Sequence, residues 1–215
     1  MAALTNKERF FHVSEILFQQ VIAVFVLLII WELFKSYSIS SKHTWHIVMS
    51  VLGLALCMAE GIQIFRRESI VTFGHSREEK RTAHLVMMGL GFVSLTIGIS
   101  LRISVTEDAS RSHFSSIHAQ LGLTTWILSF VSAMGGSISY FFPTSFNPRI
   151  IKLLHIFIGI STFIIGITTL SLGIKNYLLS GFQRGWITLI VLLALYGSYC
   201  LISPLTSFFN YLISK

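Results

Sequence analysis

Six long apolar segments, separated by short polar stretches, take up nearly the whole 215-residue chain. A helix needs about 20 predominantly apolar residues to cross a bilayer, and each segment reaches that length. The segments occupy roughly residues 14–34, 45–65, 84–103, 117–141, 151–173 and 185–211. This pattern predicts an all-α integral membrane protein with six transmembrane helices.

Each of the four middle segments carries one histidine near one of its ends. Successive histidines are 38, 34 and 37 residues apart, roughly the length of one crossing and one turn. Consecutive crossings run in opposite directions, so the histidines must alternate between the two faces of the membrane. They are His46 and His118 at one face, and His84 and His155 at the other. Ionisable residues inside apolar helices are rare and usually mark a functional site.

Small residues follow each histidine on its own helical face, because a helix turns by about 100° per residue. They are Ser50 and Gly53 after His46, Gly91 and Gly98 after His84, Gly122 and Gly136 after His118, and Gly159, Gly166 and Gly173 after His155. Small faces allow transmembrane helices to pack closely, and they also leave room for a flat macrocycle. Their alignment with a histidine on four helices favours a bound cofactor.

Haem is the cofactor that this set of ligands suits best. Neutral imidazole is a good axial ligand for haem iron, and two imidazoles fill both axial positions. Zinc would more often recruit cysteine or carboxylate beside histidine, and no C-x-x-C-H motif for covalent haem attachment occurs. We therefore predict two non-covalent b-type haems, each held by two histidines. The first and sixth spans have no histidine in their apolar cores, so we expect them to cover a four-helix haem-binding core formed by spans two to five.

Two other functions remain open at this point. A transporter or channel could use the histidines for metal ions or protons without haem, and such a protein would be colourless. A haem-bearing membrane anchor for a soluble reductase is also conceivable, but it would need one essential haem rather than four ligands.

Composition and charge agree with a membrane protein. The chain is 53% hydrophobic, has a mean hydropathy of +0.73 and carries a formal net charge of +7. Ten lysines and arginines fall on the side that holds both termini, against six on the other side. The positive-inside rule therefore places both termini in the cytosol. Because the positive charge is spread over short loops, nucleic acid is not an expected partner.

Glu60 lies deep in the second segment, 14 residues after His46, or about 21 Å along a helix. A carboxylate at this depth needs a partner. We expect it to pair with Arg66 or Arg67, with the coupling of a proton to reduction as the alternative.

The sequence around the histidines resembles the cytochrome b561 family, and most closely its short single-domain members. The segments that carry the resemblance are Thr44–Ser50, Met58–Glu60, Arg81–Leu85, Ser116–Gly122 and Lys152–Gly159. The likeness extends over roughly residues 12–210. It implies one transmembrane domain at 12–212, preceded by a short cytosolic segment at 1–11.

The resemblance also implies pairings, substrates and a location. His46 and His118 would hold the non-cytosolic haem, and His84 and His155 the cytosolic haem. The family takes electrons from cytosolic ascorbate and passes them to monodehydroascorbate or ferric iron on the far side, which makes it a transmembrane ascorbate-dependent oxidoreductase. The resemblance allows a homodimer, and we expect the endoplasmic reticulum or another endomembrane vesicle rather than the plasma membrane.

Basic residues near the cytosolic histidines suit an anionic donor, because a positive cleft concentrates anions. Arg149 matches a basic position that family members place beside ascorbate, and Lys80, Arg81 and Lys152 are the further candidates. One departure from the family concerns the acceptor: many members have a histidine twelve residues before the fourth-span ligand, where this chain has Thr106.

Overall fold

A computed structural model of the chain describes residues 6–66, 69, 72, 74–142, 147–175 and 185–213. All regular secondary structure in these ranges is helical. The elements are α1 (Asn6–Ser36), α2 (Lys42–Val51), the π-helix η1 (Leu52–Met58), α3 (Ala59–Gln63), α4 (Arg77–Asp108), α5 (Ile117–Phe141), α6 (Pro148–Gly173) and α7 (Gly185–Ile213). Since α2, η1 and α3 form one continuous crossing, the described residues contain six helices long and apolar enough to span a membrane. The predicted six-span, all-helical fold is confirmed.

The ends of several helices differ from the predicted spans. The third helix was expected at 84–103 but runs from Arg77 to Asp108. It begins early because Ser76 and Glu79 form a capping box, in which each side chain bonds to the other residue's backbone N–H. The fifth helix begins at Pro148 rather than 151, since the Asn147 side chain caps its first turn. The apolar pattern marks the part of a helix inside the bilayer, whereas caps set its true ends.

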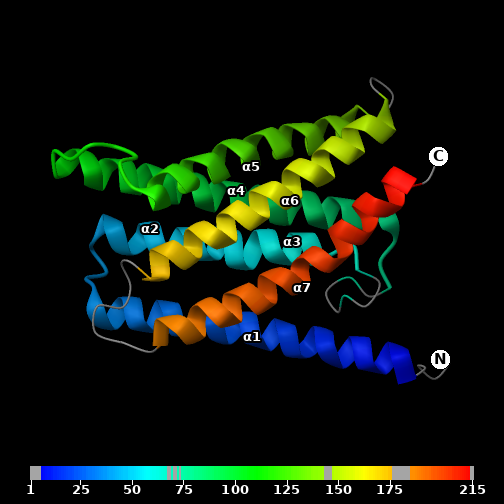
Figure 1. The fold of residues 1–215 in the computed structure, drawn as a ribbon, viewed down its shortest axis with the longest axis horizontal. Coiled ribbons are helices and arrows are strands. Elements are labelled where there is room, and N and C mark those ends of the chain that lie inside the picture. Colours follow the sequence, from blue (N-terminus) through cyan, green and yellow to red (C-terminus); the bar gives the residue numbers. More distant parts are fainter. Residues whose placement is uncertain are drawn as a thin grey trace.

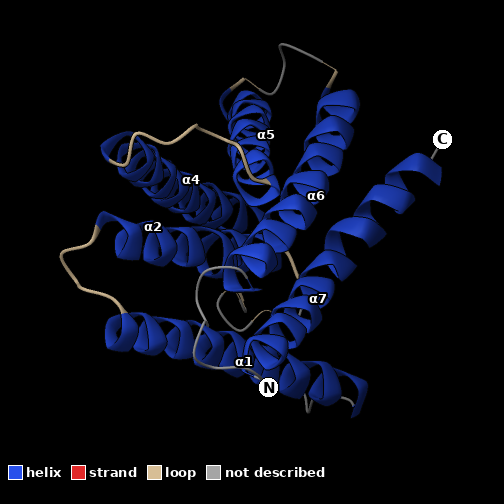
Figure 2. Cartoon of the chain, turned by 60° about the vertical axis from the view of Figure 1, so that its left-hand side comes forward, coloured by secondary structure: helices blue, strands red, loops and turns tan. Residues whose placement is uncertain are grey.

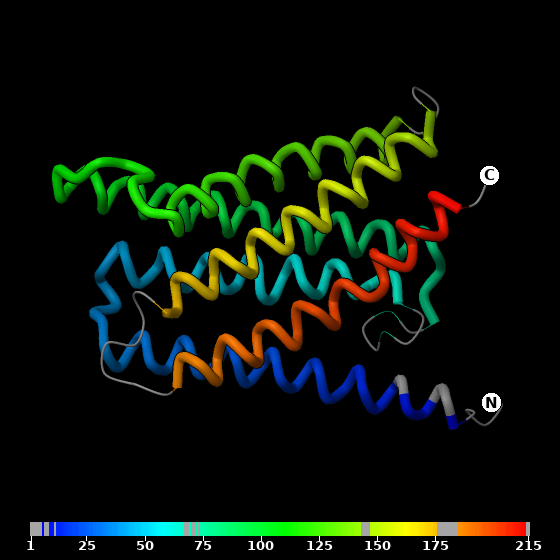
Figure 3. Tube along the Cα trace, in the orientation of Figure 1, coloured from blue at the N-terminus to red at the C-terminus, as the bar shows by residue number. Residues whose placement is uncertain are grey.

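The start of α1 and the end of α7 lie at the same end of the bundle, as the trace in Figure 3 shows. The turn between α1 and α2 and the loop between α4 and α5 lie at the opposite end (Figure 1). The crossings therefore alternate in direction, as predicted from the spacing of the histidines. Arg67, Arg184 and Lys215, which contribute to the predicted charge bias, lie outside the described residues.

The helices are arranged in neighbouring pairs. Helix α5 lies beside α6, the second crossing lies along α4, and α1 crosses α7 on the opposite side of the bundle (Figure 2). The first and last helices thus cover the second crossing, which separates them from α4. They are more than a cover, however, because Phe25, Ile29 and Leu33 of α1 and Leu193 of α7 are fully buried. These side chains and the buried apolar residues of the second crossing form the main hydrophobic cluster.

Close packing between the second crossing and α4 depends on two glycines. A Cβ atom on Gly53 would lie 2.9 Å from the carbonyl oxygen of Gly91, and one on Gly91 would lie 2.7 Å from Cγ of Met58. A Cβ on Gly166 of α6 would likewise lie 2.6 Å from a methyl group of Leu54. All three contacts involve η1, the stretch where the second crossing takes the wider π-helical form. These glycines serve helix packing.

We predict that G91A destabilises the protein, whereas G89A on the same helix does not. Overpacking a tight contact costs roughly 1–3 kcal/mol, while alanine regains up to about 1 kcal/mol of helix propensity. A Cβ on Gly89 meets nothing within 4 Å, so G89A keeps only the gain. Thermal unfolding of the two purified variants measures the difference. Identical melting temperatures would contradict the tight contact between Gly91 and the second crossing.

Candidate functional site

The four predicted histidines lie in two facing pairs, one near each end of the bundle. His46 of α2 faces His118 of α5, with ring centroids 6.4 Å apart and ring planes at 83°. His84 of α4 faces His155 of α6, with corresponding values of 6.2 Å and 81°. Each pair therefore joins two helices that are far apart in the sequence.

Every one of these imidazoles has its Nδ1 atom on a backbone carbonyl oxygen of another helix. The Nδ1–O distances are 2.8 Å from His46 to Gly98, 2.8 Å from His84 to Gly61, 3.0 Å from His118 to Thr169, and 3.0 Å from His155 to Ser132. A carbonyl oxygen can only accept, so Nδ1 carries the proton and the lone pair of the neutral ring remains on Nε2. Such a bond is the usual way in which a protein orients a metal-ligating histidine.

The spacing within each pair suits one metal ion. A first-row metal lies about 2.0–2.1 Å from an imidazole nitrogen, as zinc does, and that nitrogen lies roughly 1.1 Å from its ring centre. Two imidazoles on opposite sides of one ion would therefore have centroids about 6.2–6.4 Å apart. Both observed separations agree with this range. The residues present fit a six-coordinate haem iron with a histidine on each face.

Two glycines shape the seats of the histidine rings. A Cβ atom on Gly136 would lie 3.0 Å from Cε1 of His155, and one on Gly173 would lie 3.0 Å from Cε1 of His118. Each glycine is one helical turn after the residue whose carbonyl binds that histidine. Gly122 and Gly159 have only ordinary neighbours, at 3.6 and 3.7 Å. The glycines that follow the histidines thus serve helix packing at some positions and the imidazole rings at others.

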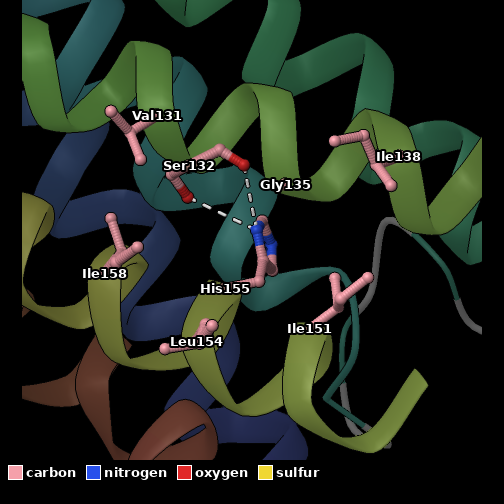
Figure 4. Close-up of a pocket in the computed structure, with 8 residues that line it drawn as sticks. All are labelled: Val131, Ser132, Gly135, Ile138, Ile151, Leu154, His155 and Ile158. Carbon is pink, nitrogen blue, oxygen red and sulfur yellow. Dashed lines mark hydrogen bonds between the residues drawn. The ribbon is translucent and has the colours of Figure 1, made fainter. Parts of the chain in front are cut away.

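A cavity of about 310 Å³ lies beside His155, between α5 and α6. Figure 4 shows the His155 ring pointing across to α5, where its Nδ1 atom meets both the carbonyl and, at 3.4 Å, the hydroxyl of Ser132. The remaining walls of this cavity are apolar, formed by Val131, Ile138, Ile151, Leu154 and Ile158. Apolar walls of this kind limit the access of water to the half-buried imidazole.

A second cavity, of about 340 Å³, includes His46 and His118 and continues to the loop between α4 and α5. Trp126 lies in its wall, and Arg102, Arg111, His43 and His113 also line it. The His43 ring stacks on His46, with centroids 6.1 Å apart, and its Nδ1 lies 3.4 Å from Nη1 of Arg102. Thr106, at the departure from the family pattern, lines the same cavity. This cavity therefore connects the His46/His118 pair with a basic, polar rim.

The four basic residues predicted to bind the donor all lie at the His84/His155 end, but they contact three different groups. Arg149 donates to the backbone oxygen of Tyr211 at 3.0 Å, and Lys152 donates to its hydroxyl at 2.6 Å. Arg81 donates to the Ser139 carbonyl at 3.2 Å and lies over the ring of Tyr140.

Lys80 instead donates to the backbone oxygen of Arg66 at 3.2 Å. Tyr211 and Tyr140 could not be recognised from the sequence, because an aromatic residue near a helix end is normally a membrane-interface anchor.

The predicted pairing of Glu60 with Arg66 is wrong. The Glu60 carboxylate accepts from Gln19 and Tyr196, at 2.6 and 2.8 Å, while Arg66 lies beside Glu15. Neutral donors from α7 and α1 reach Glu60 because α7 packs against α3 and α1 packs against the adjoining η1. Arg67, the other predicted partner, lies outside the described residues.

Known proteins match a large part of the chain. Residues 45–181 match the family model for eukaryotic cytochrome b561. The chain is 28% identical over 138 residues to the mouse protein named transmembrane reductase CYB561D2, a match covering 62% of this chain and 61% of the relative. It is 26% identical over 131 residues to transmembrane ascorbate ferrireductase 2 of Arabidopsis thaliana, covering 60% of this chain and 55% of the relative. The matches thus span less than two thirds of these relatives' lengths.

We predict that G136A weakens haem binding and that G135A does not. The added methyl group of G136A pushes against the His155 ring, whereas a Cβ on Gly135 meets nothing within 4 Å. Disturbing a ligand's support typically costs about 10–100-fold in metal affinity. Haem per chain after purification, measured by absorbance of the extracted haem, gives the comparison. Equal haem content in both variants would show that Gly136 has no part in seating His155.

Proposed function

The chain belongs to the eukaryotic cytochrome b561 family, and we propose that it carries electrons across a membrane through two b-type haems. Membership of this family implies b-type haem. In our proposal, His46 and His118 hold the haem at the non-cytosolic side, and His84 and His155 hold the haem at the cytosolic side. The observation that carries the proposal is the spacing of the two facing imidazole pairs, 6.4 and 6.2 Å between ring centroids.

Each imidazole has a defined part in this function. The bond from Nδ1 to a neighbouring carbonyl holds the ring in one orientation and leaves the Nε2 lone pair available for a metal. The two histidine pairs would hold the haems, and the bound haem would supply one-electron transfer. Apolar helices surround the two pairs between the membrane faces.

Ascorbate in the cytosol is the proposed donor. The relatives include proteins named as ascorbate-dependent, among them the mouse transmembrane ascorbate-dependent reductase CYB561. Arg149, Lys152, Lys80 and Arg81 surround the His84/His155 end with positive charge, which concentrates an anion there. The contacts of Arg149 and Lys152 with Tyr211 hold these two cations at the end of α7.

The proposed acceptor is monodehydroascorbate or ferric iron on the other side. The cavity at His46 and His118 opens towards Arg102 and Arg111, with His43 and His113 in its wall. Arginines at the rim favour an acceptor that is an anion, which applies to monodehydroascorbate and to ferric iron in an anionic chelate.

The remaining parts of the proposal follow from the family resemblance and from the distribution of positive charge. The transmembrane domain covers residues 12–212 with both termini in the cytosol, residues 1–11 precede it, and the protein resides in an endomembrane, with a homodimer as an allowed assembly. A haem-free transporter of metal ions or protons is the alternative. The paired rings favour haem over that alternative, because a metal on two opposed imidazoles alone lacks the tetrahedral ligand set of zinc.

We predict that H84A loses the cytosolic haem and keeps the other. Haem per chain should fall from about two to about one, since one axial ligand of a bis-histidine pair is gone. H75A, a change in the loop before α4, serves as the control and should keep both haems. Extracted haem and the low-spin optical spectrum provide the measurement. Two haems in H84A, with an unchanged spectrum, would exclude His84 as a ligand.

We predict that R149A weakens the use of ascorbate while both haems remain. Removing one partly solvated charge from a docking site costs roughly 1 kcal/mol, so the ascorbate concentration for half-maximal reduction should rise about 5-fold. R9A, an exposed change in the first turn of α1 at the same end of the bundle, is the matched control. Stopped-flow reduction of the haems by ascorbate provides both values. If R149A loses its haems, or reduces as R9A does, a docking role for Arg149 is contradicted.

A further inference from the structure

A cluster of charged and polar side chains, some buried and some half-buried, lies between α1, the end of the second crossing and α7. Its members are Glu15 and Gln19 of α1, Glu60, Gln63 and Arg66 at the end of the second crossing, and Tyr196, Tyr199 and Cys200 of α7. Glu15 is only 1% exposed and Arg66 only 8%. None of these residues has a part in the proposed electron transfer. Ionisable groups at such depth are costly and usually have a function.

Glu15 holds one end of this cluster. Its Oε2 atom accepts a hydrogen bond from the Tyr199 hydroxyl at 2.6 Å and lies 3.8 Å from Nε of Arg66. The guanidinium group of Arg66 lies over the Tyr199 ring, 4.0 Å from its centroid. Among the described residues, Oε1 of Glu15 has no hydrogen-bond partner although it is buried. An ionised carboxylate with one bare oxygen is an unfavourable state at this depth.

Glu60 holds the other end, and its hydrogen-bond partners among the described residues are neutral. Its two oxygens accept from the Gln19 amide at 2.6 Å and from the Tyr196 hydroxyl at 2.8 Å, both neutral donors. Gln19 lies one helical turn after Glu15 on the same face of α1. The side chain that binds Glu60 is therefore a neighbour of Glu15. The cluster therefore contains two carboxylates and one guanidinium group. With both carboxylates ionised, its net charge would be negative within an apolar bundle.

Within the part of the chain that the structure describes, the other groups bonded to this cluster do not correct this imbalance. On α7 they are Tyr196, Tyr199 and Cys200, which are neutral in their protonated forms. Gln63 joins Cys200 to Arg66 through its side-chain amide, with distances of 3.3 Å to Sγ and 3.4 Å to Nη1. The nearby cation Lys80 is directed at the backbone oxygen of Arg66 rather than at a carboxylate. One proton shared by Glu15 and Glu60 would neutralise the cluster.

The cluster lies at the depth of the cytosolic histidine pair. Glu60 directly precedes Gly61, whose carbonyl oxygen accepts the hydrogen bond from Nδ1 of His84 at 2.8 Å. In a medium of low dielectric constant, charges that lie near one another interact strongly. An electron that arrives at the His84/His155 site therefore makes ionised carboxylates at Glu15 and Glu60 less stable.

We propose that Glu15 and Glu60, with Arg66, form a proton-binding site that takes up a proton when the cytosolic histidine pair's haem is reduced. This inference rests on the proposed function. The electron comes from the one-electron donor, the proton comes from cytosolic water, and the proton converts one carboxylate into a carboxylic acid. The added negative and positive charges balance inside the bundle, and no other bond forms or breaks.

Redox-linked proton uptake by the haem-loaded protein in detergent tests this proposal. The protein is reduced at an electrode through soluble mediators in a weakly buffered solution, with a pH-indicator dye present. An infrared difference spectrum between the oxidised and reduced forms shows whether a carboxylic acid C=O stretch appears. E60Q and E15Q each remove one carboxylate and keep a side chain of the same size. E78Q, on the exposed first turn of α4, is the matched control.

The wild-type protein and E78Q should take up the same fraction of a proton per chain, with a carboxylic acid band on reduction. E60Q should lose at least half of the uptake and the band. Absence of the band in the wild type overturns the proposal without any variant, as does unchanged uptake in E60Q. E15Q makes the same comparison if E60Q does not fold. Failure of the proposed function shows separately, either as missing haem or as haem that the electrode reduces and ascorbate does not.

Discussion

The hydrogen bond between each histidine and a backbone carbonyl of a neighbouring helix is the interaction on which this structure depends. Four such bonds, at 2.8–3.0 Å, connect α2 and α3 of the second crossing with α4, and α5 with α6. Each fixes the tautomer of its imidazole, so that Nε2 is free for a metal. A histidine without this partner could rotate away, and the facing pairs would not form.

Close helix packing makes these bonds available. The contact of Gly53 with Gly91 brings the second crossing against α4, where Gly61 can reach His84. On the other side of the bundle, Gly136 and Gly173 admit the rings of His155 and His118. The bundle thus combines two antiparallel helix pairs, and each facing histidine pair takes one ring from each of them. The apolar cluster between α1, α7 and the second crossing supports this frame from one side.

The sequence predicted the six crossings, the alternation of the histidines and the two pairs that they form, because length, hydropathy and spacing carry that information. The carbonyl partners could not be predicted, since every residue has a carbonyl and only packing selects Gly61 or Thr169. Helix ends were displaced where caps such as Ser76 extend a helix beyond the membrane. The partners of Glu60 were missed because Gln19 and Tyr196 reach it from helices distant in the sequence.

The most direct test of two facing histidine pairs that carry electrons is the optical spectrum of the purified wild-type protein, before and after ascorbate is added, with haem per chain quantified. We expect about two low-spin b-type haems per chain, both reducible by ascorbate. A colourless protein, produced with haem available, would contradict the account and favour a transporter. Haem that ascorbate leaves oxidised would retain the two sites and exclude ascorbate as the donor.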